Sequence, residues 1–303
     1  NPALTGNINA DWRAISNFRN QWLGPASPYV TGTISYDRKI FQNKIPNVPD
    51  EGNVTGIGGM LMMDRAMGGI QKSVYASLNL AYSVQLSNGD IKHKLAAGFG
   101  TIYADRTIDY SRVDFEEQFT GYGFNVNLPT GETSLSNMKP YFSLSTGLTY
   151  SITSEKTNFD LGVAGFHLNK PKQTFLEDEN QILAIRKVVH SNFETYLNEK
   201  VVLNANAIYQ FQSEAKYYSF GAALGYYVPS QHDILVLSGL WYWSSNAIIP
   251  YVGFSYKDFQ VGLSSDITIS KLAQASKKPT TWELSLIIRG TSKPSTIIPC
   301  PWK

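Results

Sequence analysis

The chain has 303 residues, of which 26 are basic and 24 acidic, so its formal net charge is +2 at pH 7. The basic residues are scattered among acids, which argues against a nucleic acid as the main partner. Cys300 is the only cysteine, which excludes an intrachain disulfide and a zinc site built on paired thiolates.

Two further patterns argue against other classes of protein. The histidines at positions 93, 167, 190 and 232 lie far apart and form no HxH or HExxH motif, so we expect neither a metal centre nor a cofactor. No stretch has the roughly eighteen consecutive apolar residues of a transmembrane helix, and none resembles the core of a signal peptide. We therefore expect Asn1 to follow a processing or trimming site.

Apolar and polar side chains alternate along many segments of the chain. Between Val74 and Leu86 the even positions are apolar or aromatic, whereas the odd positions are mostly polar. The same period of two covers 259–269 and 282–289, and it begins near the N-terminus at Trp12. This period is typical of β-strands with one apolar face and one polar face.

About fourteen such segments follow one another along the chain. Many approach the ~9–11 residues with which a tilted strand crosses a bilayer, whereas strands of soluble sandwiches usually have about five or six. The predicted strands are 11–22, 29–38, 56–64, 72–86, 91–103, 140–152, 159–168, 188–197, 201–212, 216–228, 234–243, 247–256, 259–270 and 282–290.

The connections between these segments differ in length by parity. The long ones at 104–139, 169–187 and 271–281 follow odd-numbered segments, whereas most connections after even-numbered segments are short. Outer-membrane barrels have long outer loops, short periplasmic turns and an even strand count. We therefore predict one domain over 1–303, an all-β, antiparallel transmembrane barrel with both termini in the periplasm. Connection 39–56 is the exception, because its parity assigns a long segment to the periplasm.

A soluble β-sandwich is the alternative, because it also buries one face of each strand. Strand length and number favour the barrel, whose closure gives every backbone group a partner without water. The aromatic residues, which make up 13% of the chain, then have a place at the two membrane interfaces. The candidates for these girdles are Trp12, Trp22, Tyr82, Tyr227, Trp243 and Trp282.

Several separated motifs carry a family resemblance. They are NPALTG at 1–6, NFRNQW at 17–22, GVAGFHLNKPKQTF at 162–175, NAIIPYVGFSYKDFQVGLSSDITISKL at 246–272, WELSLI at 282–287 and CPWK at 300–303. In combination they resemble the PorP/SprF family of Bacteroidetes outer-membrane proteins, which is associated with type IX secretion and gliding motility. Family members normally start upstream of the NPA motif, so we expect a short N-terminal piece to be missing. The final WK differs from the arginine-phenylalanine ending of the family.

The resemblance implies a monomeric outer-membrane β-barrel, surrounded by lipid, that is not an enzyme and acts beside the type IX machinery. It implies a secreted adhesin or effector as one partner, bound through its C-terminal domain of the type B class. It also implies periplasmic partners, including a peptidoglycan-binding protein and ring lipoproteins. The alternative function is a transport barrel for a small hydrophobic or polar solute.

The stretch LGVAGFHLNKPKQTF at 161–175 raises the question of catalysis at His167. Its strand supplies only Asp160 and no serine-centred elbow, so we interpret His167 as structural. By parity the following connection is extracellular, stiffened by a proline and carrying an aromatic anchor. The candidate partner-binding residues are therefore Lys170, Pro171, Lys172 and Phe175. Folding of this loop onto the barrel is the alternative.

The polar residues at alternate positions of segment 11–22 are expected to face the lumen of the barrel. They suggest either a pathway for a solute or a network of paired side chains that fills the lumen. Mixed charge favours the network. Its candidate residues are Arg13, Arg19, Asp266, Glu283 and Arg289, with Asn17, Gln21 and Glu194 beside them. The acidic group Asp114, Glu116 and Glu117 lacks the spacing of an EF-hand and indicates a solvated loop.

Overall fold

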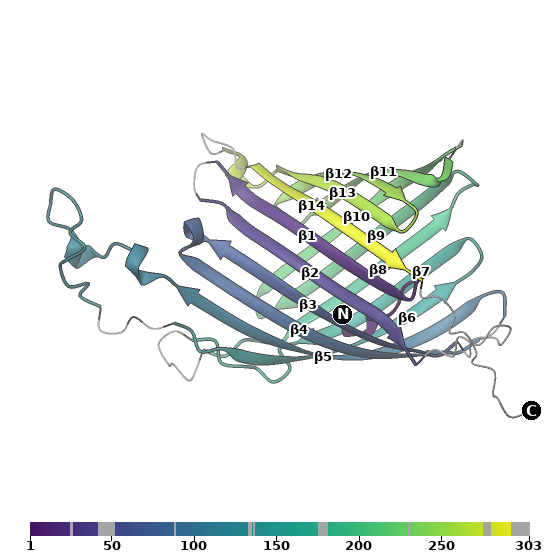
Figure 1. Cartoon of the computed structure of the whole chain (residues 1–303), viewed down its shortest axis with the longest axis horizontal. Coiled ribbons are helices and arrows are strands. Elements are labelled where there is room, and N and C mark those ends of the chain that lie inside the picture. Colours follow the sequence, from purple (N-terminus) through teal and green to yellow (C-terminus); the bar gives the residue numbers. More distant parts are fainter. Residues whose placement is uncertain are drawn as a thin grey trace, which may run out of the picture.

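The computed structural model describes residues 1–24, 27–41, 52–87, 89–132, 135, 137–174, 181–229, 231–274 and 280–291. Fourteen antiparallel strands form a closed barrel in which each strand pairs with its neighbours in sequence and β1 pairs with β14 (Figure 1). The strands are β1 (Trp12–Leu23), β2 (Tyr29–Ile40), β3 (Val54–Ala66), β4 (Gln71–Gln85), β5 (Lys92–Ile108), β6 (Tyr141–Thr153), β7 (Thr157–Phe166), β8 (Arg186–Tyr196), β9 (Val201–Gln212), β10 (Ala215–Val228), β11 (Gln231–Trp243), β12 (Ala247–Tyr256), β13 (Phe259–Thr268) and β14 (Thr280–Gly290). The predicted all-β, antiparallel barrel of about fourteen strands is confirmed.

Short 3₁₀ helices are the only helical elements of the described residues. They are η1 (Pro2–Leu4), η2 (Met67–Gly69), η3 (Tyr110–Arg112), η4 (Glu116–Gln118) and η5 (Lys271–Gln274). None of the helices in this part of the chain is long and apolar enough to cross a membrane.

The two ends of the barrel differ in their connections. The short-turn end carries the connections after β4, β6, β8, β10 and β12, and β1 begins and β14 ends there. β5, β7 and β13, which precede the three long connections, end at the opposite end of the barrel, which we call the long-loop end (Figure 1). β2 ends at the short-turn end, and most of the connection 41–53 that follows it falls outside the described residues.

The apolar face of each strand points outward. Leu78 is 67% exposed and Leu80 52% exposed, while Ser73 and Ser77 on the opposite face of β4 are buried. On β13 the same contrast separates exposed Leu263 from buried Asp266. An outer surface of large apolar side chains around a polar interior is what a lipid-facing barrel requires.

One strand is clearly longer than its sequence pattern predicts. β5 was expected to end at residue 103, but it continues to Ile108, which pairs with Gln71 on β4. The extension is stabilised by Arg106, whose guanidinium donates to Ser73 Oγ at 3.1 Å and to Tyr75 Oη at 3.2 Å. Alternation alone missed it, because the polar run ADRT at 104–107 reads as a loop.

The outward orientation of β4 gives a direct prediction for stability in lipid. Leu80→Arg places a charge on the lipid face and should lower the free energy of unfolding by roughly 2–4 kcal/mol, whereas Asn79→Arg, on the lumen face, should cost much less. Urea unfolding in lipid vesicles measures both variants. Equal losses would contradict the assignment of the two faces.

Candidate functional site

The N-terminal segment lies inside the barrel (Figure 1). Asn1 caps η1 by accepting a hydrogen bond from Ala3 N at 2.9 Å. Its Nδ2 donates to Leu148 O and Thr149 Oγ1 on β6, each at 3.1 Å. The same atom lies 2.9 Å from Nε2 of His190 on β8. The segment is therefore bonded to the lumen face of the wall.

Glycines in the wall make room for this segment. A Cβ added at Gly98 would lie 2.3 Å from Ala3 N, one at Gly56 2.2 Å from Thr5 O, and one at Gly147 2.0 Å from Asn1 Oδ1. These separations are too short for any side chain. The lumen-facing glycines of β3 and β5 are therefore required for the close approach of the two backbones, and Gly147 of β6 makes room for the Asn1 side chain.

Charged and amide side chains hold the rest of the segment. Gly6 N donates to Asp37 Oδ2 at 2.8 Å, and Asp37 also receives two hydrogen bonds from Arg13 at 3.0 and 3.1 Å. Further along, Asn7 Nδ2 donates to Asp160 Oδ1 at 3.2 Å. The bidentate Arg13–Asp37 pair thus joins the N-terminal segment to β1 and β2.

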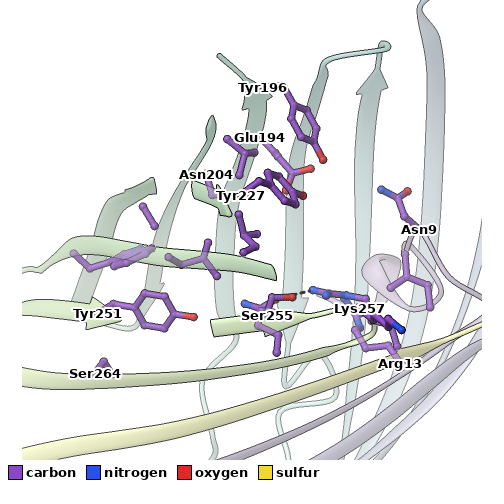
Figure 2. A pocket seen from close by; sticks show the side chains of 18 of the residues that line it. Asn9, Arg13, Glu194, Tyr196, Asn204, Tyr227, Tyr251, Ser255, Lys257 and Ser264 are labelled. Carbon is purple, nitrogen blue, oxygen red and sulfur yellow. Dashed lines mark hydrogen bonds between the residues drawn. The ribbon is translucent and has the colours of Figure 1, made fainter. Parts of the chain in front are cut away.

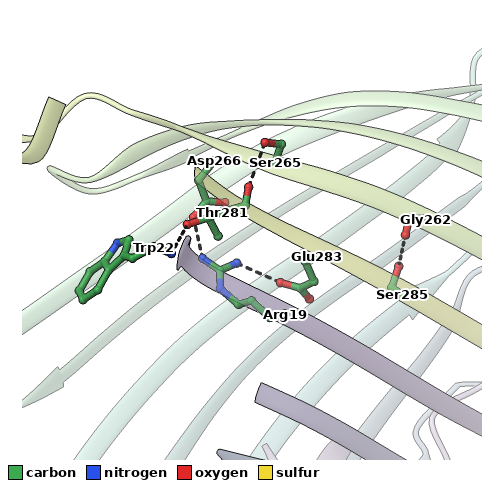
Figure 3. A network of polar contacts seen from close by, with 8 residues as sticks. All are labelled: Arg19, Trp22, Gly262, Ser265, Asp266, Thr281, Glu283 and Ser285. Atoms are coloured by element: carbon green, nitrogen blue, oxygen red, sulfur yellow. Dashed lines mark hydrogen bonds and ion pairs between the residues drawn. The ribbon is translucent and has the colours of Figure 1, made fainter. Parts of the chain in front are cut away.

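A second charged group lies near the long-loop end of the lumen (Figure 3). Arg19 Nη2 lies 2.6 Å from Asp266 Oδ2, and its Nη1 lies 3.0 Å from Glu283 Oε2. The guanidinium also lies 5.6 Å from the ring centroid of Trp243. One arginine therefore joins β1, β13 and β14.

The five candidate lumen residues do not form a single network in the structure. Arg19, Asp266 and Glu283 are together, whereas Arg13 pairs with Asp37. Arg289 donates to Gln260 Oε1 at 3.3 Å and belongs to neither group. Sequence reasoning missed Asp37, although it lies directly across from Arg13 on β2.

A cavity of about 730 Å³ lies in the lumen at the short-turn end, and we call it the lumen cavity (Figure 2). It is bounded by residues 7–9 of the N-terminal segment, by Arg13 of β1 and by β8–β14. Trp241 packs over Gly221 and Gly239, where an added Cβ would meet its ring at 2.4 and 2.6 Å. Tyr251 packs in the same way over Gly262. The wall on this side of the lumen is therefore aromatic.

For two of the six aromatic residues predicted to lie in the interfacial girdles, the prediction is wrong. Tyr227 lines the lumen cavity, and Trp243 lies beside Arg19 in the lumen. Trp282 does pack against the outward Phe18, with ring centroids 5.4 Å apart. The error arises because β10 and β11 carry large aromatic residues on both faces, so that aromatic content alone does not give the direction of a side chain.

The connection after β7 folds back onto β6. Asn169 donates from Nδ2 to Phe142 O at 2.8 Å and accepts from Leu144 N at 3.0 Å. His167, at φ 60°, lies just beyond the strand, and its Nδ1 is 2.8 Å from Ser143 Oγ. Ser143 is completely buried, so this Ser–His pair has no access to a substrate.

The four candidate partner-binding residues lie in this connection. Lys170 and Lys172 are exposed, whereas Pro171 is buried and its carbonyl accepts from Leu183 N at 2.8 Å. Phe175 lies outside the described residues. Burial of Pro171 gives it a role in the shape of the loop.

The connection after β5 extends beyond the strands at the long-loop end (Figure 1). Its residues 119–126, which we call the aromatic tip, form a small hairpin in which Phe119 and Phe124 make a β-bridge with rings 5.2 Å apart. Thr120 N donates to Gly123 O at 2.9 Å. Tyr122 at the turn is fully exposed, with a relative accessibility of 104%.

Buried Gln118 holds the base of the aromatic tip. Its Nε2 donates to Leu128 O at 3.1 Å, and its Oε1 accepts from Phe115 N at 3.2 Å. Its backbone carbonyl accepts from Asn125 N at 2.8 Å. The exposed aromatic residues are therefore presented by an ordered loop. Within the described ranges, no group of three or more His, Cys, Asp or Glu side chains is placed to hold a metal ion.

Comparisons with known proteins agree with this architecture. The family described as type IX secretion system membrane protein PorP/SprF matches residues 1–288. No curated protein matches the chain. The toluene transporter TodX of P. putida has a TM-score of 0.53 and 8% identity, with 97% of this chain and 93% of TodX covered. A Pseudomonas aeruginosa FadL homologue has a TM-score of 0.51 and 10% identity, with 95% and 92% covered. At these identities the likeness concerns the fold alone.

The Arg19 group gives a prediction for stability. Arg19→Gln leaves Asp266 and Glu283 without their cation and should lower the free energy of unfolding by about 3 kcal/mol. Adding Asp266→Asn and Glu283→Gln should recover most of that loss. Urea unfolding in vesicles is the measurement. Arg106→Gln, which removes an arginine hydrogen-bonded only to the neutral Ser73 and Tyr75, is the control and should cost less than Arg19→Gln. A loss that persists in the triple variant would show that the charges are not its cause.

His167 gives a prediction for pH. Burial and, to a lesser degree, the charge of Arg186 lower the pKa of His167 from 6.5 to about 4. Because the opened loop binds a proton more readily, the folded connection should lose stability as the pH falls below 6.5 and through 4. Corrected amide exchange at Leu168, whose N–H donates to Leu144 O, should therefore be faster at pH 5 than at pH 7. His167→Gln should remove this difference, and an unchanged difference in that variant would assign it to another group.

Proposed function

The chain belongs to the PorP/SprF family of type IX secretion system membrane proteins, and from this we propose that it binds a secreted protein at the cell surface. It is an outer-membrane β-barrel, and membership of this family implies contact with components of the secretion system. The proposed cargo is a secreted adhesin or effector, held through its C-terminal domain. The proposed periplasmic contacts are a peptidoglycan-binding protein and ring proteins of the machine.

The aromatic tip is the observation that carries this proposal. Phe119 and Phe124 are each 53% exposed, Val126 is 68% exposed, and Tyr122 projects fully into solvent. An exposed aromatic cluster at the end of an ordered loop is typical of a protein-binding surface. Because Gln118 already orders the loop, binding loses little conformational entropy.

Acidic residues near the aromatic tip would help to orient the bound partner. Asp114, Glu116 and Glu117 all lie within a few residues of its base. Acidic residues at the rim of an apolar surface favour a partner whose own rim is basic, and they increase the rate of association. We therefore propose that this connection makes the main contact with the cargo. The exposed Lys170 and Lys172, in the connection after β7, make a second contact.

The short-turn end supplies the surface for the periplasmic contact that we propose. A groove there is lined by Glu155, Lys156, Glu199 and Lys200, together with Tyr196 and Asn198. Exposed charges of both signs suit a transient contact between proteins. Binding, and not catalysis, is the proposed activity, and the buried Ser143 beside His167 supports it.

Retention of secreted protein at the cell surface tests the proposal. Tyr122→Ser should weaken retention about tenfold, as expected for an exposed aromatic hot spot, and should leave the barrel folded. A pull-down of secreted proteins from detergent-solubilised membranes measures retention, and heat-modifiability on gels reports folding. Phe175→Ala is the companion variant for the neighbouring connection. Loss only in Phe175→Ala would move the cargo site there, and full retention in both would refute cargo binding by these loops.

Thiol labelling in the same cells tests which end of the barrel faces the outside. In a Cys300→Ser background, Tyr122→Cys should react with a membrane-impermeant thiol reagent on whole cells, whereas Glu199→Cys at the short-turn end should react only after lysis. The reverse pattern would invert the barrel and remove the cargo site from the cell surface.

A further inference from the structure

The lumen cavity contains two charged side chains that form no ion pair with a described residue, although their charges act on each other at longer range. Arg289 donates only to the neutral Gln260, at 3.3 Å, and Glu194 accepts only from the neutral Asn158, also at 3.3 Å. Partly enclosed charges are normally paired, because removing them from water is costly. The two residues do not form an ion pair with each other, so each still has hydrogen-bonding capacity.

Arg289 is placed to hold an anionic group. It lies directly across from Arg13, and two cations at facing positions repel each other. Asp37 neutralises Arg13 through two hydrogen bonds, whereas Arg289 forms no ion pair and only feels the carboxylates of Glu194 and Asp258 at longer range. The planar guanidinium has donors left for a carboxylate. Lys257, another cation of the cavity lining, already has a carboxylate partner, since its Nζ lies 3.9 Å from Asp233 Oδ2.

Glu194 is placed to hold a cationic group. Figure 2 shows it beside Tyr196 and Tyr227, with Arg13 and Lys257 grouped on another side of the cavity. The two tyrosine rings are stacked, with centroids 6.4 Å apart and an interplanar angle of 15°. A carboxylate next to aromatic rings provides the charge and the π-surface that attract an ammonium group.

The lining of the lumen cavity also offers a surface for an apolar body. It includes Leu235, Leu237, Trp241 and Tyr251. Trp241 is fixed by its hydrogen bond from Nε1 to Asn206 Oδ1 at 3.0 Å and by the glycines beneath it. A volume of about 730 Å³ lies within the range of about 300–1,000 Å³ for small-molecule sites.

We propose that the lumen cavity binds a short peptide with free termini. The ammonium end binds Glu194 beside Tyr196 and Tyr227, the carboxylate end binds Arg289, and an apolar side chain packs on the wall formed by Trp241 and Tyr251. A simple anion or a simple cation fits less well, because either leaves one of the two charges without a partner. This site is independent of the cargo surface on the long loops.

Three forms of one tripeptide test the proposal on the purified barrel. Isothermal titration calorimetry with Ala-Phe-Ala should give saturable binding. N-acetylation, which removes the ammonium charge, and C-amidation, which removes the carboxylate charge, should each weaken binding about tenfold. Absence of saturable binding by the free tripeptide, or equal affinity for all three forms, would overturn the proposal. This comparison requires no variant to fold.

Two variants assign the ends of the peptide. Arg289→Gln should weaken binding of the free tripeptide, and C-amidation should then cause no further loss of affinity. N-acetylation should still weaken binding to this variant. Glu194→Gln should abolish the effect of acetylation alone. Arg106→Gln, a matched change away from the cavity lining, should behave as the unaltered barrel, and heat-modifiability confirms folding of each variant. Full sensitivity to amidation in Arg289→Gln would refute the assigned carboxylate site.

Discussion

The pairing of β1 with β14 is the constraint on which the rest of the structure depends. In a bilayer an unpaired backbone group costs several kcal/mol, on the order of a lost hydrogen bond without water to replace it, so the sheet must close. The pairing extends from Trp12 opposite Gly290 to Leu23 opposite Thr280. It also brings Arg19 beside Glu283, so that the charge group of the lumen forms only when the barrel has closed. Closure and the lumen network are thus one cooperative unit.

Closure of fourteen strands creates a lumen too wide for the wall side chains to fill alone. The chain fills the two sides of this space differently. On the side of β3–β6, small residues such as Gly98 and Gly147 admit the N-terminal segment. On the side of β9–β13, large rings such as Trp241 and Tyr251 cover the glycines of their own wall and leave the lumen cavity between them. The placement of glycine therefore decides where backbone enters and where space remains.

The alternation of side chains was sufficient to predict every strand, because the lipid and the lumen select opposite chemistry at successive residues. It failed where that selection is absent. β5 continues past residue 103 because Arg106 finds hydrogen-bond partners in the wall, and Tyr227 and Trp243 face inward on strands with aromatic residues on both faces. The N-terminal segment in the lumen was also missed, since contacts such as Asn1 with His190 join residues far apart in sequence. Of the lumen network, the sequence predicted Arg13, Arg19, Asp266, Glu283 and Arg289 but not Asp37, the partner of Arg13.

The position of the N-terminal segment bears on the alternative function, solute transport. Hydrogen bonds from Asn1, Gly6 and Asn7 join the segment to β6, β2 and β7, and the lumen-facing glycines hold its backbone too closely for a solute to pass between them. A pathway through this side of the lumen would require all of these contacts to break together. The aromatic side remains, but there two opposite charges, Arg289 and Glu194, face the space. Such a lining favours a ligand of matching charge over a neutral solute, which supports the binding role that we propose for the lumen.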